Sequence, residues 1–151
     1  MPDQTRFTMH PIGVIRSPFT DKGQTPIQPS RSQAIGRVEL YPEFAEGLQD
    51  IEGFSHIILL YVFHSSSDYT LRVKPFLDDQ WRGLFATRYP CRPNPIGLSI
   101  VRLLARHSNV LEIEGVDVLD GTPLLDLKPY VPEFDVRAEV QTGWYHHRSK
   151  K

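Results

Sequence analysis

Hydrophobic positions along the chain fall into short runs that predict β-strands. Apolar and polar residues alternate in the stretches 12–16, 36–40 and 109–121, which is the period-2 pattern of a strand with one buried face. Residues 55–64 are almost continuously apolar and rich in β-branched and aromatic side chains, as expected of a strand buried on both faces. Further strands are predicted at residues 70–76, 82–88, 97–107 and 123–130.

Turn-forming residues separate these runs at roughly ten-residue spacing, which is typical of barrels and sandwiches. Thirteen prolines interrupt the chain too often for long helices. Only residues 42–50 suggest a helix, because Pro42 suits a first turn and Glu43 and Glu46 suit the positive end of a helix dipole. No glycine-rich strand-to-helix turn indicates a Rossmann fold. We therefore predict an all-β (mainly β) fold with one short helix, in which the strands form either an antiparallel barrel or a sandwich.

Length and composition favour a single domain. The 151 residues suit one domain over 1–151, with a core at about 12–135 and a basic tail at 141–151. A single cysteine, Cys91, excludes an intrachain disulfide and fits a reducing compartment. The longest apolar run, 57–63, is too short to cross a bilayer, and the N-terminus lacks the apolar region of a signal peptide. We expect a cytoplasmic protein that does not bind a membrane.

The charge balance limits the classes of partner. A formal net charge of −1 argues mildly against a protein that coats nucleic acid. A local basic patch remains compatible, because basic residues gather in the middle of the sequence at Arg72, Lys74, Arg82, Arg88, Arg92, Arg102 and Arg106. The histidines at 146 and 147 lack further ligands at metal spacing, so no metal site is predicted.

Three polar stretches are candidates for chemistry. Residues 16–31 form a long, proline-stiffened segment with two glutamines that can donate and accept hydrogen bonds. Residues 85–99 hold two arginines and a rigid frame of prolines around Asn94, which suits an anion or a planar ring. Residues 117–130 bring three aspartates to one lysine. Taken singly, each is also compatible with an ordinary surface loop or turn with solvated charges.

Together these stretches resemble the TsaA/TrmO family. The motifs occur in the family's order as IGVIRSPF, TPIQP, GFSHIILLYVFH, GLFATRYPCRPNPIGLS and DVLDGTPLLDLKPYVPEFD. The resemblance spans residues 12–130, and it is closest to the shorter, single-domain members. It implies an antiparallel barrel that binds S-adenosyl-L-methionine, works as a homodimer and places the cofactor pocket near the subunit interface. It also implies N6-methylation of N6-threonylcarbamoyladenosine at position 37, in the anticodon loop of tRNA.

The resemblance further implies site residues. The matching motifs put cofactor contacts at Pro26, Ile27, Gln28, His64, Ser65, Arg88, Leu98, Asp120, Gly121, Thr122 and Pro123. Asp120 and His64 are the candidates for a catalytic group that assists proton removal, and the sequence does not decide between them. We expect the substrate to be held by Arg92, Asn94 and Lys128.

Two other functions fit the same sequence. The near-zero net charge favours a methyltransferase that acts on a small molecule. A non-catalytic barrel that binds S-adenosyl-L-methionine and regulates a partner is the third reading. Methyl transfer to tRNA separates the first function from both others, whereas cofactor binding without any product favours the regulatory barrel.

Overall fold

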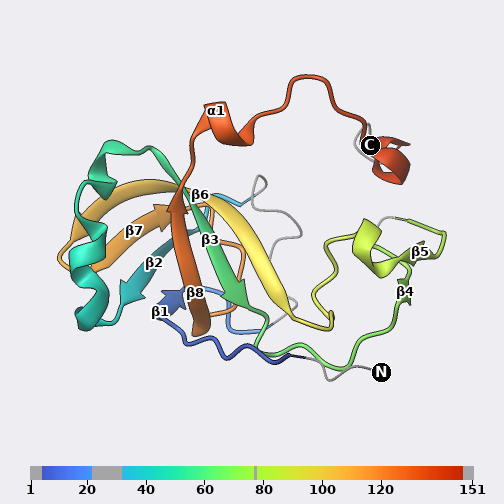
Figure 1. Ribbon diagram of the computed structural model, residues 1–151, viewed down its shortest axis with the longest axis horizontal. Helices are drawn as coiled ribbons and strands as arrows, with labels where there is room; N and C mark the ends of the chain where they lie inside the picture. Colours follow the sequence, from blue (N-terminus) through green and yellow to red (C-terminus); the bar gives the residue numbers. More distant parts are fainter. Residues whose placement is uncertain (1–4, 22–31, 77, 148–151) are drawn as a thin grey trace.

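Six strands close into an antiparallel barrel in the computed structural model, which describes residues 5–21, 32–76 and 78–147 (Figure 1). The strand order around the barrel is β1-β2-β7-β6-β3-β8, and every neighbouring pair is antiparallel. The prediction of an antiparallel β-barrel is therefore confirmed. The strands are β1 (Gly13–Arg16), β2 (Ile35–Leu40), β3 (His56–Val62), β6 (Ile96–His107), β7 (Val110–Glu114) and β8 (Thr122–Pro129).

Alternate side chains of each strand point inward and fill the barrel. Fully buried examples from the different strands are Ile15, Val38, Ile57, Val101, Ile113 and Leu124. The expectation that residues 55–64 are buried on both faces was wrong. In β3 the residues Ile57, Leu59 and Tyr61 are buried, whereas those between them are only half-buried. A closed barrel has a single interior, so the outward side chains of β3 are covered only by their neighbours on β6 and β8.

The predicted helical segment begins at Pro42 as expected, but it is not an α-helix. It forms the 3-10 helix η3 (Pro42–Leu48), followed by the short 3-10 helix η4 (Ile51–Gly53). Leu48, the last residue of η3, and Ile51, the first of η4, are buried, and Asp50 between the two helices has a left-handed backbone with a φ of 73°. Among the described residues the only α-helix is α1 (Pro132–Asp135), which the sequence reading did not predict.

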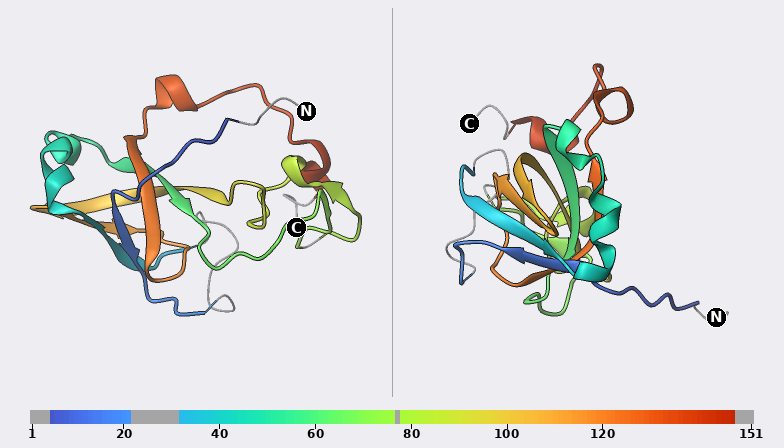
Figure 2. Two further views of the ribbon diagram at one scale, coloured as in Figure 1. Left: turned by 60° about the horizontal axis from the view of Figure 1, so that its bottom comes forward. Right: turned by 90° about the vertical axis from the view of Figure 1, so that its left-hand side faces the viewer.

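Residues 63–95 leave the barrel between β3 and β6 and project from one side, as Figures 1 and 2 show. We call this segment the excursion. It contains a two-stranded sheet of β4 (Arg72–Val73) and β5 (Arg82–Gly83), followed by the 3-10 helix η5 (Leu84–Ala86). The strands expected at 70–76 and 82–88 are thus only two residues long. Pro75 cannot donate a ladder hydrogen bond, and the 3-10 turn at Leu84 ends β5.

The C-terminal part of the chain packs against the excursion. The 3-10 helix η6 (Gly143–His147) carries Trp144, whose indole Nε1 donates a 2.8 Å hydrogen bond to the carbonyl of Ala86. The guanidinium of Arg82 lies 5.3 Å from the centre of the Trp144 ring. The first residues of the predicted basic tail, 141–147, therefore help to hold the excursion in place; residues 148–151 lie outside the described part of the chain.

Candidate functional site

One rim of the barrel brings together parts of the three polar stretches that the sequence singled out, namely residues 17–21, 85–95 and 117–121. In an antiparallel barrel, the ends of β1, β3 and β7 lie at the same rim as the starts of β2, β6 and β8. The excursion, residues 115–121 and the two described ends of the 17–34 connection, residues 17–21 and 32–34, lie at this rim. Segments that are distant in the sequence therefore meet around one barrel mouth. Loops at a barrel mouth, carried by a rigid wall, are a common setting for a ligand site.

A buried polar chain lies in this mouth. The hydroxyl groups of Tyr61 and Ser99 are 2.7 Å apart, and Ser99 Oγ donates a 2.7 Å hydrogen bond to Asp117 Oδ1. Tyr61 and Ser99 are buried, with exposed fractions of 3% and 1%. Gly97 makes room for this arrangement, because a side chain there would overlap the ring of Tyr61. We call Tyr61, Ser99 and Asp117 the polar chain.

Burial changes the acidity of both ends of the polar chain. It raises the pKa of Asp117 to about 6, and the hydrogen bond from Ser99 offsets this only in part. Burial, reinforced by the nearby Asp117 charge, also raises the pKa of Tyr61, whereas the positive charge of Arg88 acts in the opposite direction. The mouth therefore combines a carboxyl group whose pKa is raised to about 6 with a guanidinium, that of Arg88, whose charge acts on Tyr61. Such perturbed carboxyl groups are concentrated at functional sites.

The two described ends of the 17–34 connection are fastened on either side of Asp117. Ser17 Oγ donates a 2.6 Å hydrogen bond to the carbonyl of Val118, and Ser32 Oγ donates one of 2.6 Å to the carbonyl of Val116. This connection therefore leaves and rejoins the barrel beside the polar chain. The predicted cofactor contacts in it, Pro26, Ile27 and Gln28, lie outside the described residues.

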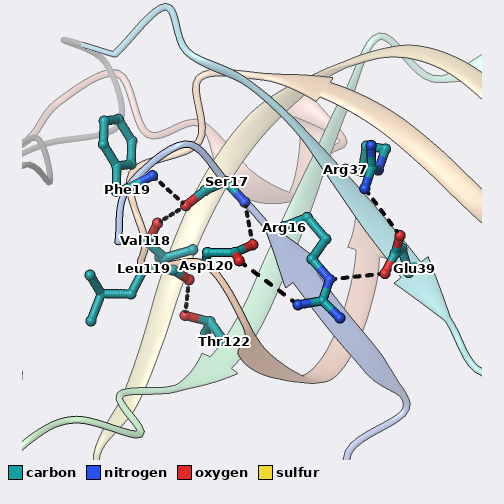
Figure 3. Close-up of polar contacts among 9 residues, drawn as sticks. All are labelled: Arg16, Ser17, Phe19, Arg37, Glu39, Val118, Leu119, Asp120 and Thr122. Carbon is teal, nitrogen blue, oxygen red and sulfur yellow. Dashed lines mark hydrogen bonds and ion pairs between the residues drawn. The ribbon is translucent and has the colours of Figure 1, made fainter. Parts of the chain in front are cut away.

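Asp120 is already engaged by the start of that connection (Figure 3). The backbone N–H of Ser17 donates a 3.1 Å hydrogen bond to Asp120 Oδ1, and Arg16 Nη1 lies 3.9 Å from Oδ2. Arg16 also pairs with Glu39 on β2, with Nε 3.0 Å from Oε1. These contacts give Asp120 a structural task, fixing the turn before β8 to the end of β1. Its predicted catalytic and cofactor-binding roles remain predictions.

The residues after Asp120 form a fixed turn. Gly121 has a φ of 84°, a conformation that favours glycine, and its N–H donates a 2.9 Å hydrogen bond to the carbonyl of Ile15. Thr122 is buried and donates a 2.6 Å hydrogen bond through Oγ1 to the carbonyl of Leu119. Pro123 follows at the start of β8. The side chain of Thr122 is therefore committed to the turn, and a ligand at this point would meet backbone groups.

His64 and Ser65 lie at the same rim, directly after β3, and both are exposed. The N–H of Phe63 donates a 2.8 Å hydrogen bond to the carbonyl of Pro95. This bond joins the two ends of the excursion and brings His64 and Ser65 to the level of Asn94, which is also exposed. The structure thus brings together predicted residues from opposite ends of a long connection.

Arg92 folds back onto its own loop. Its Nη1 donates hydrogen bonds to the carbonyls of Thr87 and Tyr89, at 2.9 and 3.0 Å. Its guanidinium lies 5.7 Å from the centre of the Phe85 ring. Arg92 therefore braces residues 85–92, which include Arg88. The contact of Arg92 with substrate remains a prediction. It would use the guanidinium nitrogens other than Nη1, which already binds the two carbonyls.

Two predicted residues do not face the barrel mouth. Leu98 points outward from β6 and is 45% exposed, whereas its neighbours Gly97 and Ser99 point inward. Lys128 lies six residues along β8 from Thr122, roughly 20 Å from the rim at the usual rise per residue. Its Nζ pairs with Asp126 at 2.9 Å. Any role for these two residues therefore requires a ligand or a partner on the outer surface.

The sequence reading missed the polar chain as a unit. Asp117 belonged to the third polar stretch and Ser99 ended the second, but neither was predicted as a site residue, and Tyr61 was interpreted as part of an apolar strand. The available signal was that Ser99 occupies an inward position of β6, between Gly97 and Val101. A hydroxyl at a core position needs a hydrogen-bond partner, and that partner is a carboxylate at the rim.

Within the described ranges, no helix is long and apolar enough to cross a membrane. In the same part of the chain, no three His, Cys, Asp or Glu side chains are grouped so that they could hold a metal ion.

A closed antiparallel barrel whose rim loops lie around a partly buried carboxylate places this protein among β-barrels with a candidate ligand site at the mouth. The family model described as the tRNA-methyltransferase O N-terminal domain matches residues 14–136. The chain therefore belongs to the tRNA-methyltransferase O family, and the resemblance drawn from its motifs is confirmed.

Relatives from archaea, bacteria and mammals share this domain. A probable S-adenosyl-L-methionine-binding protein of Pyrococcus abyssi is 58% identical over 135 residues, covering 89% of this chain and 73% of that protein. The human tRNA (adenine(37)-N6)-methyltransferase is 37% identical over 133 residues, covering 83% of this chain. A crystal structure of TrmO from Pseudomonas aeruginosa matches 93% of this chain with 41% identity and a TM-score of 0.77.

The chain is shorter than several of these relatives. It spans 63% of the solved Pseudomonas aeruginosa chain and 30% of the human enzyme. The shared part is the barrel with its rim, and the activities of the longer proteins are considered below as a proposal for this chain.

Proposed function

We propose that this protein is an S-adenosyl-L-methionine-dependent tRNA methyltransferase that methylates N6 of adenosine 37. The observation that carries the proposal is that, in a chain of this family, the excursion and the described ends of the 17–34 connection meet at the rim beside Asp117, with the charge of Arg88 close enough to act on Tyr61. Names of relatives support both the cofactor and the reaction. The finer part of the proposal is that the acceptor carries a threonylcarbamoyl group on N6.

The residues at the rim fit the charges of S-adenosyl-L-methionine. The cofactor has a sulfonium and an ammonium group at one end, together with a carboxylate. Asp117 supplies a partly buried negative charge above its pKa of about 6. Arg88 is exposed and, among the described residues, forms no ion pair. An arginine of this kind is suited to a carboxylate, which it can bind with two parallel hydrogen bonds.

When bound, the cofactor supplies an already activated methyl group. The protein then has to position the cofactor and the acceptor and to stabilise the charges of the reacting groups. In this proposal Asp117 faces the cationic end and Arg88 holds the carboxylate. The polar chain fixes the Asp117 carboxylate, because Ser99 occupies one of its oxygens and Tyr61 in turn supports Ser99. The fastened ends of the 17–34 connection keep the mouth in shape.

A strong general base is not essential to this chemistry. A carbamoylated exocyclic nitrogen loses its proton more readily than the amino group of adenine itself. His64 is exposed at the rim, whereas Asp120 is held by Ser17 and Arg16. His64 is therefore the better placed of the two to take up a proton, and Asp120 is better suited to holding the turn. An anticodon-loop base costs little to unstack into such a site.

The proposal includes a homodimer and a cytoplasmic location, where tRNA is modified. The outer face of β6 carries apolar side chains that are 41–45% exposed, at Ile96, Leu98, Ile100 and Leu104, with the exposed Arg102 between the last two. A second copy that covers these side chains would bury Leu98 and place the partner beside the start of β6, at the rim. This would account for a cofactor contact at Leu98 even though its side chain points away from the barrel interior.

The direct test is methyl transfer from tritiated S-adenosyl-L-methionine by the purified protein. The acceptor is bulk tRNA from a strain that lacks its own enzyme of this family, and tRNA from the parent strain is the control. The proposal predicts incorporation into the first tRNA only. Label transferred to small molecules of a cell extract but not to tRNA would favour the small-molecule methyltransferase. Cofactor binding with no labelled product would favour the regulatory barrel.

A further inference from the structure

Exposed aromatic residues gather on the excursion. Between residues 69 and 89 five aromatic side chains are 41–70% exposed: Tyr69, Phe76, Trp81, Phe85 and Tyr89. None of them belongs to the barrel core. Large aromatic surfaces left in water commonly mark a binding site. The proposed methyl-transfer chemistry at the barrel mouth does not use them.

Trp81 and Tyr89 line a pocket with a volume of about 370 Å³. The same pocket is lined by two basic side chains, Arg72 and Lys74, and by one acid, Asp68. Ser67, Thr70, Val73 and Cys91 complete it. Its volume falls within the usual range for small-ligand sites. It is formed by the excursion alone, away from the polar chain.

The cations of this pocket are available to a ligand. Among the described residues, neither Arg72 nor Lys74 forms an ion pair. By contrast, the neighbouring Arg82 is held by Asp78 at 2.8 Å and lies over the Trp144 ring. Arg82 thus stabilises the excursion through its contacts with Asp78 and Trp144, whereas Arg72 and Lys74 line the pocket.

We propose that this pocket binds an unpaired nucleotide of the RNA substrate, with its base stacked on Trp81 and its phosphates held by Arg72 and Lys74. Aromatic faces next to basic side chains are the usual means of binding single-stranded nucleic acid. Asp68 then accepts a hydrogen bond from an amino group on the edge of the base, as acids do in base recognition. This rests on the proposed function and adds to it a second contact with RNA, outside the barrel mouth.

The test measures binding of a fluorescein-labelled anticodon stem–loop RNA by fluorescence anisotropy. We expect Trp81→Ala to weaken binding about tenfold or more, because stacking on one aromatic ring contributes that much. Trp81→Phe should retain most of the affinity, since it keeps a ring face. Phe134→Ala, which removes an exposed aromatic from α1, is the matched control and should bind as the wild type does.

The contribution of charge is measured separately. Replacing both Arg72 and Lys74 by alanine should lower the slope of log affinity against log salt by about 1.4, as expected for two single-strand phosphate contacts. Arg37→Ala on β2 is the control, because Arg37 pairs only with Glu39 in the barrel wall. Heparin, which carries charge but no bases, should bind Trp81→Ala and the wild type equally. A drop in heparin binding by Trp81→Ala would contradict stacking.

Parallel methylation assays distinguish failure of this inference from failure of the proposed function. If the wild type methylates tRNA and all pocket variants bind RNA as it does, the pocket is not an RNA subsite. If the pocket variants lose RNA binding but the wild type transfers no methyl group, the subsite stands and the methyltransferase proposal falls. If the wild type binds no RNA, both are overturned.

Discussion

Ser99 and Asp117 lie 18 positions apart in the sequence and are joined by a 2.7 Å hydrogen bond at the mouth of the barrel. Ser99 belongs to β6, and Asp117 belongs to the connection between β7 and β8. The two residues therefore meet only in the folded protein. Their hydrogen bond holds the Asp117 carboxyl group, whose pKa is raised, among the loops of the rim.

The first prediction concerns stability against pH. Because the pKa of Asp117 is raised from 3.8 to about 6, the folded state binds more protons than the unfolded state between these values. The free energy of unfolding therefore falls as pH rises from about 4 to about 6, and Asp117 accounts for a loss of roughly 3 kcal/mol at most. Asp117→Asn cannot ionise and should be more stable than the wild type at pH 7 by up to that amount.

Urea unfolding of both proteins at several pH values measures this difference. The advantage of Asp117→Asn should disappear at pH 4, where the wild-type carboxyl is protonated. A stability difference that stays constant from pH 4 to pH 7 would show that Asp117 is not in the environment described here.

The second prediction concerns the polar chain as a unit. Ser99→Ala leaves the buried Asp117 carboxyl without its donor and should cost about 1–3 kcal/mol of unfolding free energy. Tyr61→Phe removes one hydroxyl and should cost about 1 kcal/mol. Since both variants disturb the same chain, the double variant should cost less than the two losses added together. Additive losses in urea unfolding would mean that the two hydroxyls act independently.

A third prediction compares two glycines. Gly97→Ala places a methyl group against the ring of Tyr61, in a rigid part of the barrel. It should destabilise the protein by about 1–3 kcal/mol, as overpacking does. Gly83→Ala is the control, because a side chain there meets no atom within 4 Å among those described. Thermal unfolding should show a clear fall for the first variant and little change for the second.

A fourth prediction concerns Arg92. Its removal frees the carbonyls of Thr87 and Tyr89 and takes away the guanidinium that the proposed function assigns to the substrate. Arg92→Ala should lower kcat/KM for tRNA about tenfold to a hundredfold, the effect of losing one charged hydrogen bond. Arg92→Lys should restore only part of it, because an ammonium group cannot replace a planar fork.

Calorimetry with S-adenosyl-L-methionine shows which ligand Arg92 serves. The cofactor affinity of Arg92→Ala should stay close to that of the wild type. A collapse of cofactor affinity would instead assign Arg92 to the donor side. If Arg92→Ala and Arg92→Lys both methylate tRNA at the wild-type rate, the only role left for Arg92 is to brace its own loop.

Local patterns were sufficient to predict a mainly β fold, and the family's motifs decided for a barrel over a sandwich. Alternation in residues 12–16 and 36–40 marked β1 and β2 with errors of one residue, because the period of a half-buried strand is visible in the sequence. The structure of the excursion was harder to predict from the sequence, because strands of two residues next to Pro75 are too short to show an alternating pattern. The continuous apolar run at 55–64 suggested burial on both faces, and only the closed barrel shows that one of these faces is the outside.

The candidate site could be predicted in outline but not in detail. Motifs identified the three rim stretches, since each is unusual in composition on its own. The polar chain depends on the pairing of Tyr61 with Gly97 across β3 and β6, and no local pattern specifies which strands become neighbours. In the same way, no local pattern indicated that Asp120 would be bound by Ser17 and Arg16, because those residues are more than a hundred positions away.

The central claim is tested most directly by mass spectrometry of tRNA nucleosides. Bulk tRNA that lacks the modification is incubated with this protein and S-adenosyl-L-methionine, digested and compared with tRNA incubated with Arg88→Ala. The account predicts N6-methylated threonylcarbamoyladenosine with the wild type and strongly reduced product with Arg88→Ala. No new methylated nucleoside with the wild type, under conditions in which it binds the cofactor, would contradict it.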